Sequence, residues 1–351
     1  MIRLYGHSLG EGSFAQVTRG MLRALKAHGS LAGFLPVDDL QKDLEFEGAD
    51  APVALNCGAP SMAALPLTVG QHKHRWLLLA PNSNGVPKAI QTLLGPSKLT
   101  GFLAPSQWAV EVLQREFPGM PVLLAEHGVS PEIHHPDARE HEQRVLAYRY
   151  DEMRVLHVSS TLGQRKGTKN LLRAWSRLRA EKKLPTRATL HVVVHPLASS
   201  ECRYLARGDD SIFVRPSMSM APRVYTSVLR AAHLVVQPSR SEGFGLVPLE
   251  ALCCGTPIVA TACTGHSAYL YDAVPGFVRV EHGPDAPIDD FPGATAPTVS
   301  EDAIADALVL AIGNWLALAS DALACAPALG AAWTWEKRNA AAISEMIAMS
   351  K

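Results

Sequence analysis

The chain of 351 residues is 47% hydrophobic, and its 33 basic side chains balance 33 acidic ones. This length predicts about two domains, each with its own core, and the neutral balance excludes a general attraction to nucleic acid or to anionic membranes. The six cysteines show neither a Cys-x-x-Cys pair nor a spacing with histidine that is typical of zinc sites, so neither a metal site nor a redox pair is expected from them.

The chain begins with a predicted strand, loop and helix. Residues 2–5 form an apolar run that predicts a buried strand, and residues 14–28 carry apolar side chains at helical spacing. Gly12 lies in the loop between them. No apolar core of a signal peptide precedes the strand, and glycine and proline interrupt the uncharged stretch 251–271. We therefore expect a cytoplasmic protein without an integral membrane segment.

The rest of the N-terminal half continues this alternation. Asn82 and Ser83 follow a predicted strand, and polar side chains at the carboxyl end of a parallel strand can meet a sugar; a turn that needs them for its backbone is the alternative. His72 and His74 point to one face of a strand, but without a third ligand they do not predict a metal site. The predicted elements are strands at 52–55, 76–80, 99–104 and 122–125 and a helix at 106–117 with Ser106 as its N-cap.

A linker and a second series of elements follow. Residues 131–151 are rich in proline, histidine and charge and show little periodicity, which predicts a linker at 136–150. Residues 281–298, rich in proline, glycine and acidic side chains, predict a surface loop. The predicted elements of this half are strands at 155–158, 190–194, 212–214, 234–236 and 258–260 and helices at 168–179, 221–231, 300–318 and 334–349.

A glycine loop joins two of these strands. Gly243 and Gly245 allow a tight turn, and Pro248 suits the first turn of the helix that follows. The free N–H groups at the start of that helix would lie at the carboxyl end of the sheet, where a phosphate binds readily. Glu242 and Glu250 flank those donors, which would suit a ligand with a central phosphate and hydroxyls at both ends. A loop that serves packing alone is the alternative.

The segment Glu242-Gly-Phe-Gly-Leu-Val-Pro-Leu-Glu250, followed by Gly255-Thr256-Pro257, resembles the E-x7-E motif of retaining glycosyltransferases of the family 4 type, the glycosyl transferases group 1. The resemblance implies the GT-B fold, an α/β fold with two Rossmann-like domains facing across a cleft and a C-terminal helix that crosses back to the N-terminal domain. It implies an acceptor domain at 1–135 with the C-terminal helix 334–351, the linker, and a nucleotide-sugar donor domain at 151–333.

The resemblance also implies roles for single residues. Glu242 would bind a hydroxyl of the transferred sugar, and Glu250 would bind the ribose. Lys166 matches the lysine of a family loop that holds the diphosphate; the arginine that commonly lies five residues earlier is Thr161 here, and Arg165 would take over its charge. The catalytic set is Glu242, Lys166 and Arg165. The donor-binding set is Gly243, Phe244, Gly245, Leu246, Glu250, Gly12 and Thr161, and the cleft or acceptor set is His127, Asn82, Ser83 and His266.

The expected activity is transfer of a hexose from a nucleotide diphosphate, UDP-glucose or similar, to an acceptor hydroxyl with retention of configuration. No Asp-x-Asp sequence occurs, so neither a metal ion nor another cofactor is expected on the diphosphate. The acceptor stays open between a glycan, a lipid, a small molecule and modified DNA.

Three alternatives accompany this expectation. The same chemistry on a hydroxymethylated DNA base, as in phage-type DNA glucosyltransferases, would use the basic stripe Lys169, Arg173 and Arg177, although a solvated helix face is the simpler interpretation of that stripe. A Rossmann dehydrogenase is disfavoured because Gly-x-Gly-x-x-Gly is absent. A non-catalytic nucleotide-sugar binding module would carry the same loop.

Overall fold

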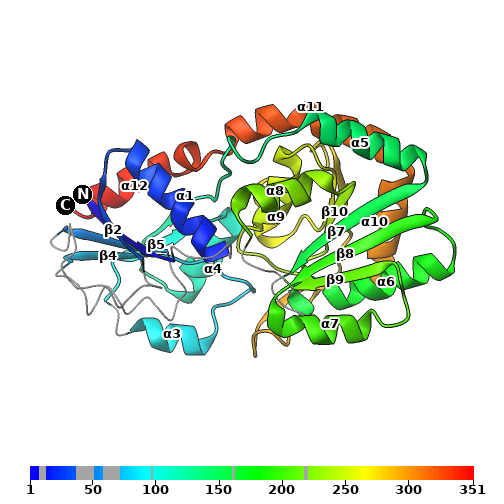
Figure 1. Ribbon diagram of the computed structural model, residues 1–351. Coiled ribbons are helices and arrows are strands. Elements are labelled where there is room, and N and C mark those ends of the chain that lie inside the picture. Colours follow the sequence, from blue (N-terminus) through cyan, green and yellow to red (C-terminus); the bar gives the residue numbers. More distant parts are fainter. Residues whose placement is uncertain (8–12, 37–50, 58–71, 96–97, 160–162, 217–219) are drawn as a thin grey trace. The chain divides into compact units, whose positions relative to one another are not determined.

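The computed structural model describes the chain except for residues 8–12, 37–50, 58–71, 96–97, 160–162 and 217–219. It divides into two compact units, the first formed by Met1–Ser130 with Ala332–Lys351 and the second by Pro131–Ala331. Within the residues described, each unit is built on one parallel sheet of six strands (Figure 1). The predicted α/β class with two sheets is thus confirmed.

The first unit has the strand order β2-β1-β3-β4-β5-β6. Ser106 caps α4, because its Oγ accepts a hydrogen bond of 3.2 Å from the backbone N–H of Ala109, as predicted. The strand β2 was not predicted, because it lies at the sheet edge and buries only Leu35 fully. The elements are β1 Ile2–Gly6, α1 Ser13–Ala27, β2 Leu31–Pro36, β3 Val53–Asn56, β4 His74–Leu78, α3 Lys88–Leu94, β5 Gly101–Ala104, α4 Gln107–Glu116, β6 Val122–Leu124 and α12 Trp335–Met349.

The C-terminal helix α12 is part of this first unit. It packs on α1, where Gly20 leaves room for the indole of Trp335: a Cβ at position 20 would lie 2.1 Å from that ring. Asn339 Nδ2 donates to the carbonyl oxygen of Glu126 at 2.9 Å, and Trp76 Nε1 donates to Ser350 Oγ at 3.1 Å. The predicted return of the last helix to the N-terminal domain is therefore confirmed.

The second unit has the strand order β12-β11-β10-β7-β8-β9. Its core is aliphatic, with Trp175 and Trp315 fully buried in it. The strands are β7 Glu152–Ser159, β8 Arg187–Val194, β9 Ile212–Pro216, β10 Leu234–Gln237, β11 Ile258–Ala260, β12 Phe277–Arg279, β13 Asp285–Pro287 and β14 Thr295–Pro297. The helices are α5 Ala138–Arg149, α6 Thr168–Ala180, α7 Ser199–Leu205, α8 Pro222–Ala231, α9 Leu246–Cys253, α10 Glu301–Gly313 and α11 Trp315–Ala332, with short 3₁₀ turns η3 Gln164–Lys166, η4 Pro196–Ala198 and η5 Thr264–Ala268.

The predicted linker 136–150 is a helix, α5, that belongs to the second unit. Asp137 begins it by accepting from the backbone N–H groups of Arg139 and Glu140. The buried Arg144 guanidinium donates to the carbonyl oxygens of Ala232 and Gly255 and to Thr256 Oγ1, at 2.9–3.0 Å. The prediction was wrong because a buried arginine, and not a stripe of apolar side chains, anchors this helix. The sequence of the helix therefore shows no apolar periodicity.

Two further predictions near the carboxyl end differ from the structure. The predicted surface loop 281–298 contains an antiparallel hairpin of β13 and β14. The predicted helix 300–318 is two helices, α10 and α11. Among the helices of the described residues, α11 is the one with the length and hydropathy of a membrane span, which by itself is weak evidence because core helices pass the same test.

A buried histidine, His157, ties β7 to its neighbours. Its Nδ1 lies 2.8 Å from the carbonyl oxygen of Val236 on β10, and its Nε2 lies 2.9 Å from Thr168 Oγ1 on α6. Burial lowers the pKa of His157 to about 4, and burial together with Arg154 and Arg144 lowers the pKa of His233 to about 3. Both rings are thus held neutral inside the second unit.

These two histidines predict acid sensitivity. The unfolded chain binds protons at an ordinary histidine pKa of about 6.5 and the folded unit does not, so stability is complete above about pH 6.5 and falls as the pH drops toward the folded values. Between about pH 6 and 4.5, each histidine should lower the free energy of unfolding by about 1.4 kcal/mol for each pH unit of acidification. Urea unfolding at several pH values measures this slope.

His157→Gln tests the assignment. The variant should reduce the slope of the unfolding free energy against pH by about 1.4 kcal/mol per pH unit, the contribution of one histidine. This reduction is independent of any loss of stability that the variant shows at pH 7.5. An unchanged slope in this variant would contradict the prediction.

Candidate functional site

The candidate site forms where two neighbouring strands, β7 and β10, end. β10 pairs with β7 in parallel, so the loops that follow them leave the same edge of the sheet. The backbone N–H of Arg240 donates to the carbonyl oxygen of Arg165 at 2.7 Å, which joins the two loops. Gly167 has φ of 68°, and a Cβ there would lie 2.3 Å from the Pro238 carbonyl oxygen. Glycine at 167 therefore lets the loops touch.

The Glu242 carboxylate is the centre of this site. Its Oε2 lies 3.1 Å from Arg165 Nη1, and its Oε1 accepts from the Lys166 ammonium and, at 2.9 Å, from Ser239 Oγ. The side chains of Glu242 and Arg165 are each only 9% exposed. The backbone N–H of Glu242 donates to Thr264 Oγ1 at 3.0 Å. The structure thus brings the three predicted catalytic residues together; their catalytic roles stay predictions.

Opposite charges fix the protonation states in this cluster. Burial alone would raise the pKa of Glu242, but Lys166 and Arg165 hold it well below its ordinary value. Burial lowers the pKa of Lys166, and the contact with Glu242 counteracts that effect. At neutral pH the carboxylate is therefore ionised, and the cluster is a buried ion group in which each charge depends on the others.

His266 and Gly245 meet beside Glu242. Gly245 has φ of 81°, and a Cβ there would lie 2.1 Å from His266 Nε2. His266 Nδ1 lies 2.9 Å from the Thr261 carbonyl oxygen, and burial lowers the pKa of this ring while Glu242 opposes the shift. The neutral imidazole of His266 is thus packed against the glycine loop, in the same site as the predicted catalytic residues.

The helix α9 starts from the glycine loop, with Gly245 at its N-cap position. Phe244 is buried, and its ring packs against Tyr269 with the ring centres 5.2 Å apart. Tyr269 also donates its hydroxyl to the Gly245 carbonyl oxygen. This packing holds the backbone of the predicted donor-binding residues Gly243 to Leu246 at the sheet edge, where their role in binding stays a prediction.

Glu250 lies one turn into α9 and has two partners that the sequence did not suggest. Tyr225 donates its hydroxyl to Glu250 Oε2 at 3.1 Å, and His134 Nε2 lies 3.6 Å from Oε1. Burial raises the pKa of Glu250, and His134 opposes this. Both partners are distant in sequence from Glu250 and carry no motif, so only the fold reveals them.

The other predicted site residues fall outside the described residues or belong to the first unit. Gly12 and Thr161 lie outside the described residues. Asn82, Ser83 and His127 belong to the first unit. Ser83 Oγ donates to the Gly85 carbonyl oxygen at 2.7 Å, as in the predicted turn, and the buried His127 ring packs on Trp335 with burial lowering its pKa to about 3. Contact of these residues with an acceptor stays a prediction.

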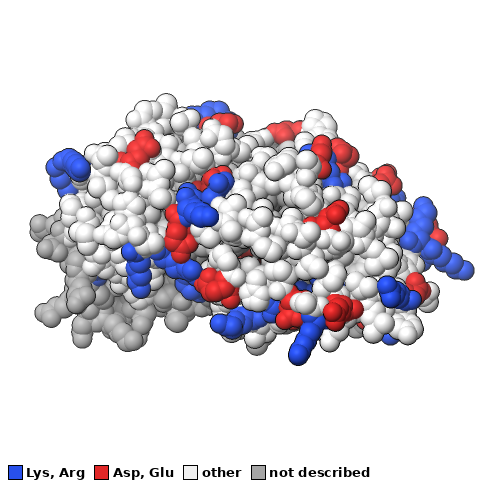
Figure 2. All heavy atoms as spheres, turned by 90° about the horizontal axis from the view of Figure 1, so that it is seen from above, with Lys and Arg blue, Asp and Glu red and all other residues white. Residues whose placement is uncertain are grey.

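The basic stripe on α6 is matched by carboxylates. Lys169 Nζ lies 2.9 Å from Glu201 Oε1. Arg173 Nη1 lies 3.1 Å from Glu301 Oε1, and the Arg177 guanidinium pairs with the Asp302 carboxylate. On the face drawn in Figure 2, basic and acidic side chains are interspersed rather than gathered by sign. This pairing favours the interpretation of the stripe as a solvated helix face over one that contacts DNA phosphates.

No metal-binding group is found in the part of the chain that the structure describes. Three or more histidine, cysteine, aspartate or glutamate side chains with suitable geometry do not converge anywhere among those residues. The buried carboxylate Glu242 is occupied by cationic and hydroxyl donors instead.

Part of the chain is similar to proteins of known family. Residues 152–309 match the family model of the glycosyl transferases group 1. The D-inositol 3-phosphate glycosyltransferase of Kribbella flavida is 34% identical over 185 residues, which is 50% of this chain and 42% of the relative. The corresponding enzyme of Stackebrandtia nassauensis is 33% identical over 175 residues, 46% of this chain and 38% of the relative. The matches thus span less than half the length of these curated relatives.

Solved structures show the same fold. Sucrose-phosphate synthase from Thermosynechococcus elongatus superposes with a TM-score of 0.67 over 99% of this chain and 98% of its own, at 16% identity. HepE of Anabaena in complex with UDP-glucose gives a TM-score of 0.63 over 98% and 99%, also at 16% identity. At such low identity the likeness concerns the fold alone, and it agrees with the GT-B arrangement that the sequence resemblance implies.

The contact between Gly245 and His266 can be tested by adding one methyl group. Gly245→Ala should cost about 1–2 kcal/mol for the left-handed backbone and about 1–3 kcal/mol more for displacing the imidazole. Gly208→Ala is the matched control in the same unit, because Gly208 also has positive φ but open space at the Cβ position. Urea denaturation should show the larger loss at 245; equal losses would contradict the described contact.

Proposed function

Because residues 152–309 match the family model of the glycosyl transferases group 1, we propose that the protein transfers a hexose from a nucleotide-diphosphate sugar to an acceptor hydroxyl. The observation that carries this proposal is the buried cluster of Glu242, Arg165 and Lys166 at the carboxyl ends of β10 and β7. It offers a carboxylate for sugar hydroxyls and two cations for a diphosphate. These groups hold one another in place before a ligand arrives, which is what transition-state stabilisation requires.

The cations would act on the leaving group. When the bond between the anomeric carbon and the diphosphate oxygen breaks, the diphosphate gains negative charge, and Arg165 and Lys166 would stabilise that charge in a site with little water. Lys166 remains protonated because Glu242 counteracts the effect of burial on its pKa. The carboxylate would meanwhile accept a hydrogen bond from a sugar hydroxyl and orient the ring.

Glu250 would bind the ribose of the nucleotide. A carboxylate has about four lone-pair positions, and the contacts with Tyr225 and His134 occupy one on each oxygen. The remaining positions suit the two adjacent ribose hydroxyls. In this proposal Tyr225 and His134 orient the carboxylate rather than compete with the ligand.

We further propose that the transfer retains the anomeric configuration and needs no metal. Glu242 is held by Arg165, Lys166 and Ser239 and has a lowered pKa, so it is a weak nucleophile, and a covalent glycosyl intermediate on it is disfavoured. The acceptor would then attack from the face that the diphosphate leaves, and the departing diphosphate would take the acceptor's proton. The two cations supply the charge stabilisation that a divalent ion gives elsewhere.

The donor is proposed to be UDP-glucose or a close relative, since HepE of Anabaena, which shares this fold, is described in complex with UDP-glucose. A small-molecule or glycan hydroxyl is the proposed acceptor class, and inositol 3-phosphate belongs in the first acceptor screen because of the name that the curated relatives carry. The cytoplasmic location stays a prediction. Because the basic side chains of the stripe on α6 are paired with carboxylates, the stripe does not favour a DNA acceptor.

Charge removal in the cluster tests the proposed function. Glu242→Gln and Lys166→Ala should each lower the rate of hexose transfer from UDP-glucose by about 100-fold or more, because each removes a preorganised charge from the reacting groups. Glu301→Gln is the control, since it removes an exposed carboxylate whose partner is Arg173. Circular dichroism checks that the fold is kept. Wild-type transfer rates in both cluster variants would rule out the assigned roles.

Product stereochemistry and metal dependence test the proposed mechanism. Proton NMR of the first product formed from an α-linked donor should show an α-glycoside, and the rate should not change when EDTA is added. A β-linked product, or loss of activity with EDTA that magnesium restores, would refute retention or metal independence respectively.

A further inference from the structure

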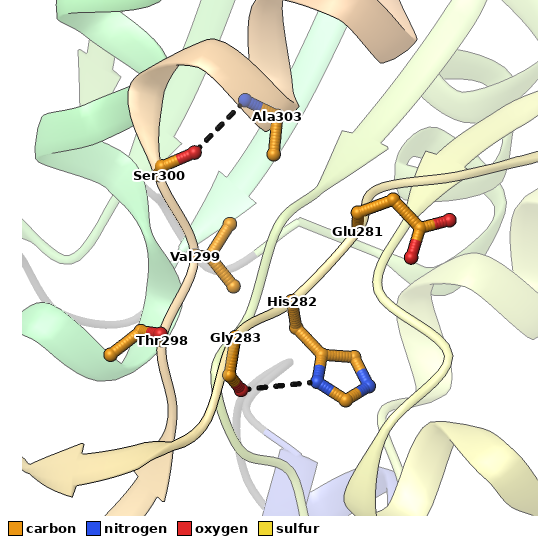
Figure 3. A pocket seen from close by; sticks show the side chains of 7 residues that line it. All are labelled: Glu281, His282, Gly283, Thr298, Val299, Ser300 and Ala303. Atoms are coloured by element: carbon orange, nitrogen blue, oxygen red, sulfur yellow. Dashed lines mark hydrogen bonds between the residues drawn. The ribbon is translucent and has the colours of Figure 1, made fainter.

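The hairpin of β13 and β14 is a separate small structure attached to the second unit. It has its own apolar contacts, made by Ile288, Ala294 and Ala296 with Phe291 against them. The segments that enter and leave the hairpin border a cavity of about 300 Å³ (Figure 3), which is lined by Glu281, His282, Gly283, Thr298, Val299, Ser300 and Ala303. At its base the hairpin is closed by hydrogen bonds from the Gly283 N–H to the Thr298 carbonyl oxygen at 2.9 Å and from the Thr298 N–H to the Pro284 carbonyl oxygen at 3.0 Å.

Arg240 contacts the hairpin from inside the glycine loop. It lies two residues before Glu242 and is only 7% exposed. Its guanidinium donates to carbonyl oxygens of both hairpin strands and their ends, with distances of 2.8 Å to Pro297, 3.0 Å to Ala296, 2.9 Å to Ala286 and 3.3 Å to Pro287. It also donates to Gln164 Oε1 at 2.7 Å. One side chain thus ties the hairpin to the loop that carries Arg165 and Lys166.

The tip of the hairpin makes the second half of the connection. Asp290 Oδ2 accepts from the backbone N–H of Arg165 at 2.9 Å, and Asp289 Oδ2 accepts from Gln164 Nε2 at 2.7 Å. Gly163 leaves the space for this contact, because a Cβ there would lie 1.8 Å from Asp290 Oδ1. The hairpin tip therefore docks on the backbone of residues 163–165.

From these contacts we propose that Arg240 is a positioning residue: it locks the hairpin onto the loop 163–167 and so sets where Arg165 and Lys166 present their charges. The inference rests on the proposed function for its consequence, which is donor affinity. In this proposal Arg240 acts through Gln164 and through the hairpin that carries Asp290, not on the donor. A hairpin that undocks would leave Arg165 and Lys166 on a loop with fewer backbone constraints, and a diphosphate would have to order them at a cost in affinity.

The test uses variants that loosen the hairpin in different ways. Arg240→Lys removes the forked guanidinium, and Gly163→Ala blocks the tip contact without changing any charge; at φ of −57° the backbone at position 163 accepts alanine. Asp290→Ala removes the acceptor for the Arg165 amide, whereas Asp290→Asn keeps an oxygen there and should lie closer to the wild type than Asp290→Ala does. Arg173→Lys, an exposed arginine on α6, is the matched control for the first variant.

Two measurements are made on the full chain. Hydrogen exchange followed by mass spectrometry should show faster exchange of peptides covering 163–167 in Arg240→Lys, Gly163→Ala and Asp290→Ala, with peptides of β7, β8 and β10 unchanged. Calorimetry with UDP should show Kd raised about 10-fold in the same three variants and unchanged in the control. The double variant that combines Arg240→Lys and Gly163→Ala should bind UDP no more weakly than either single variant, because both substitutions act on the same docking contact.

The possible outcomes separate the inference from the proposed function. Unchanged exchange at 163–167 together with unchanged Kd would overturn the inference, as would faster exchange throughout the second unit, since that indicates a purely structural role for Arg240. Faster exchange confined to 163–167 in a protein whose wild type binds no UDP would support the positioning contact and count against the proposed function instead.

Discussion

The charge balance around Glu242 is the interaction on which the candidate site depends. A carboxylate and an arginine that are each 9% exposed would be costly to bury alone, and removing one member of such a buried pair typically costs about 3–5 kcal/mol. Glu242, Arg165 and Lys166 therefore stabilise one another, and they come from two loops that the sheet brings to one edge. This mutual dependence holds the three charges in fixed positions at that edge.

Close backbone approach is the second requirement, and glycine provides it. At positions 167 and 245 a Cβ would come within 2.1–2.3 Å of neighbouring atoms, and both residues have positive φ. Gly265 is similar, since a Cβ there would meet the Gly243 backbone at 2.4 Å. These positions bring the β7 loop, the β10 loop and the 3₁₀ turn η5 into direct contact. The ion cluster is thus held by a scaffold that tolerates almost no added atoms.

Much of this architecture could be predicted from the sequence, and several of the failures share one physical cause. The apolar runs of the core strands and the motif from Glu242 to Glu250 were visible because periodicity and glycine spacing are local signals. The helix α5, the β13–β14 hairpin and the partners Tyr225 and His134 were missed. Each of these is held by polar contacts between residues far apart in the chain, such as Arg144 with Gly255 or Arg240 with Pro297. Such contacts cannot be predicted from the pattern of hydrophobic residues in the sequence.

The position of α12 has a consequence for the order in which the protein is made. The first unit takes its last helix from residues that follow about 200 residues of the second unit, and α12 covers α1 at Gly20 and Trp335. At ribosomal rates of about 5–20 residues per second, that delay is roughly 10–40 s. During synthesis the sequence of the second unit is therefore complete before that of the first, although the first unit begins earlier in the chain. Until α12 has been made, the surface of α1 that packs on it stays uncovered.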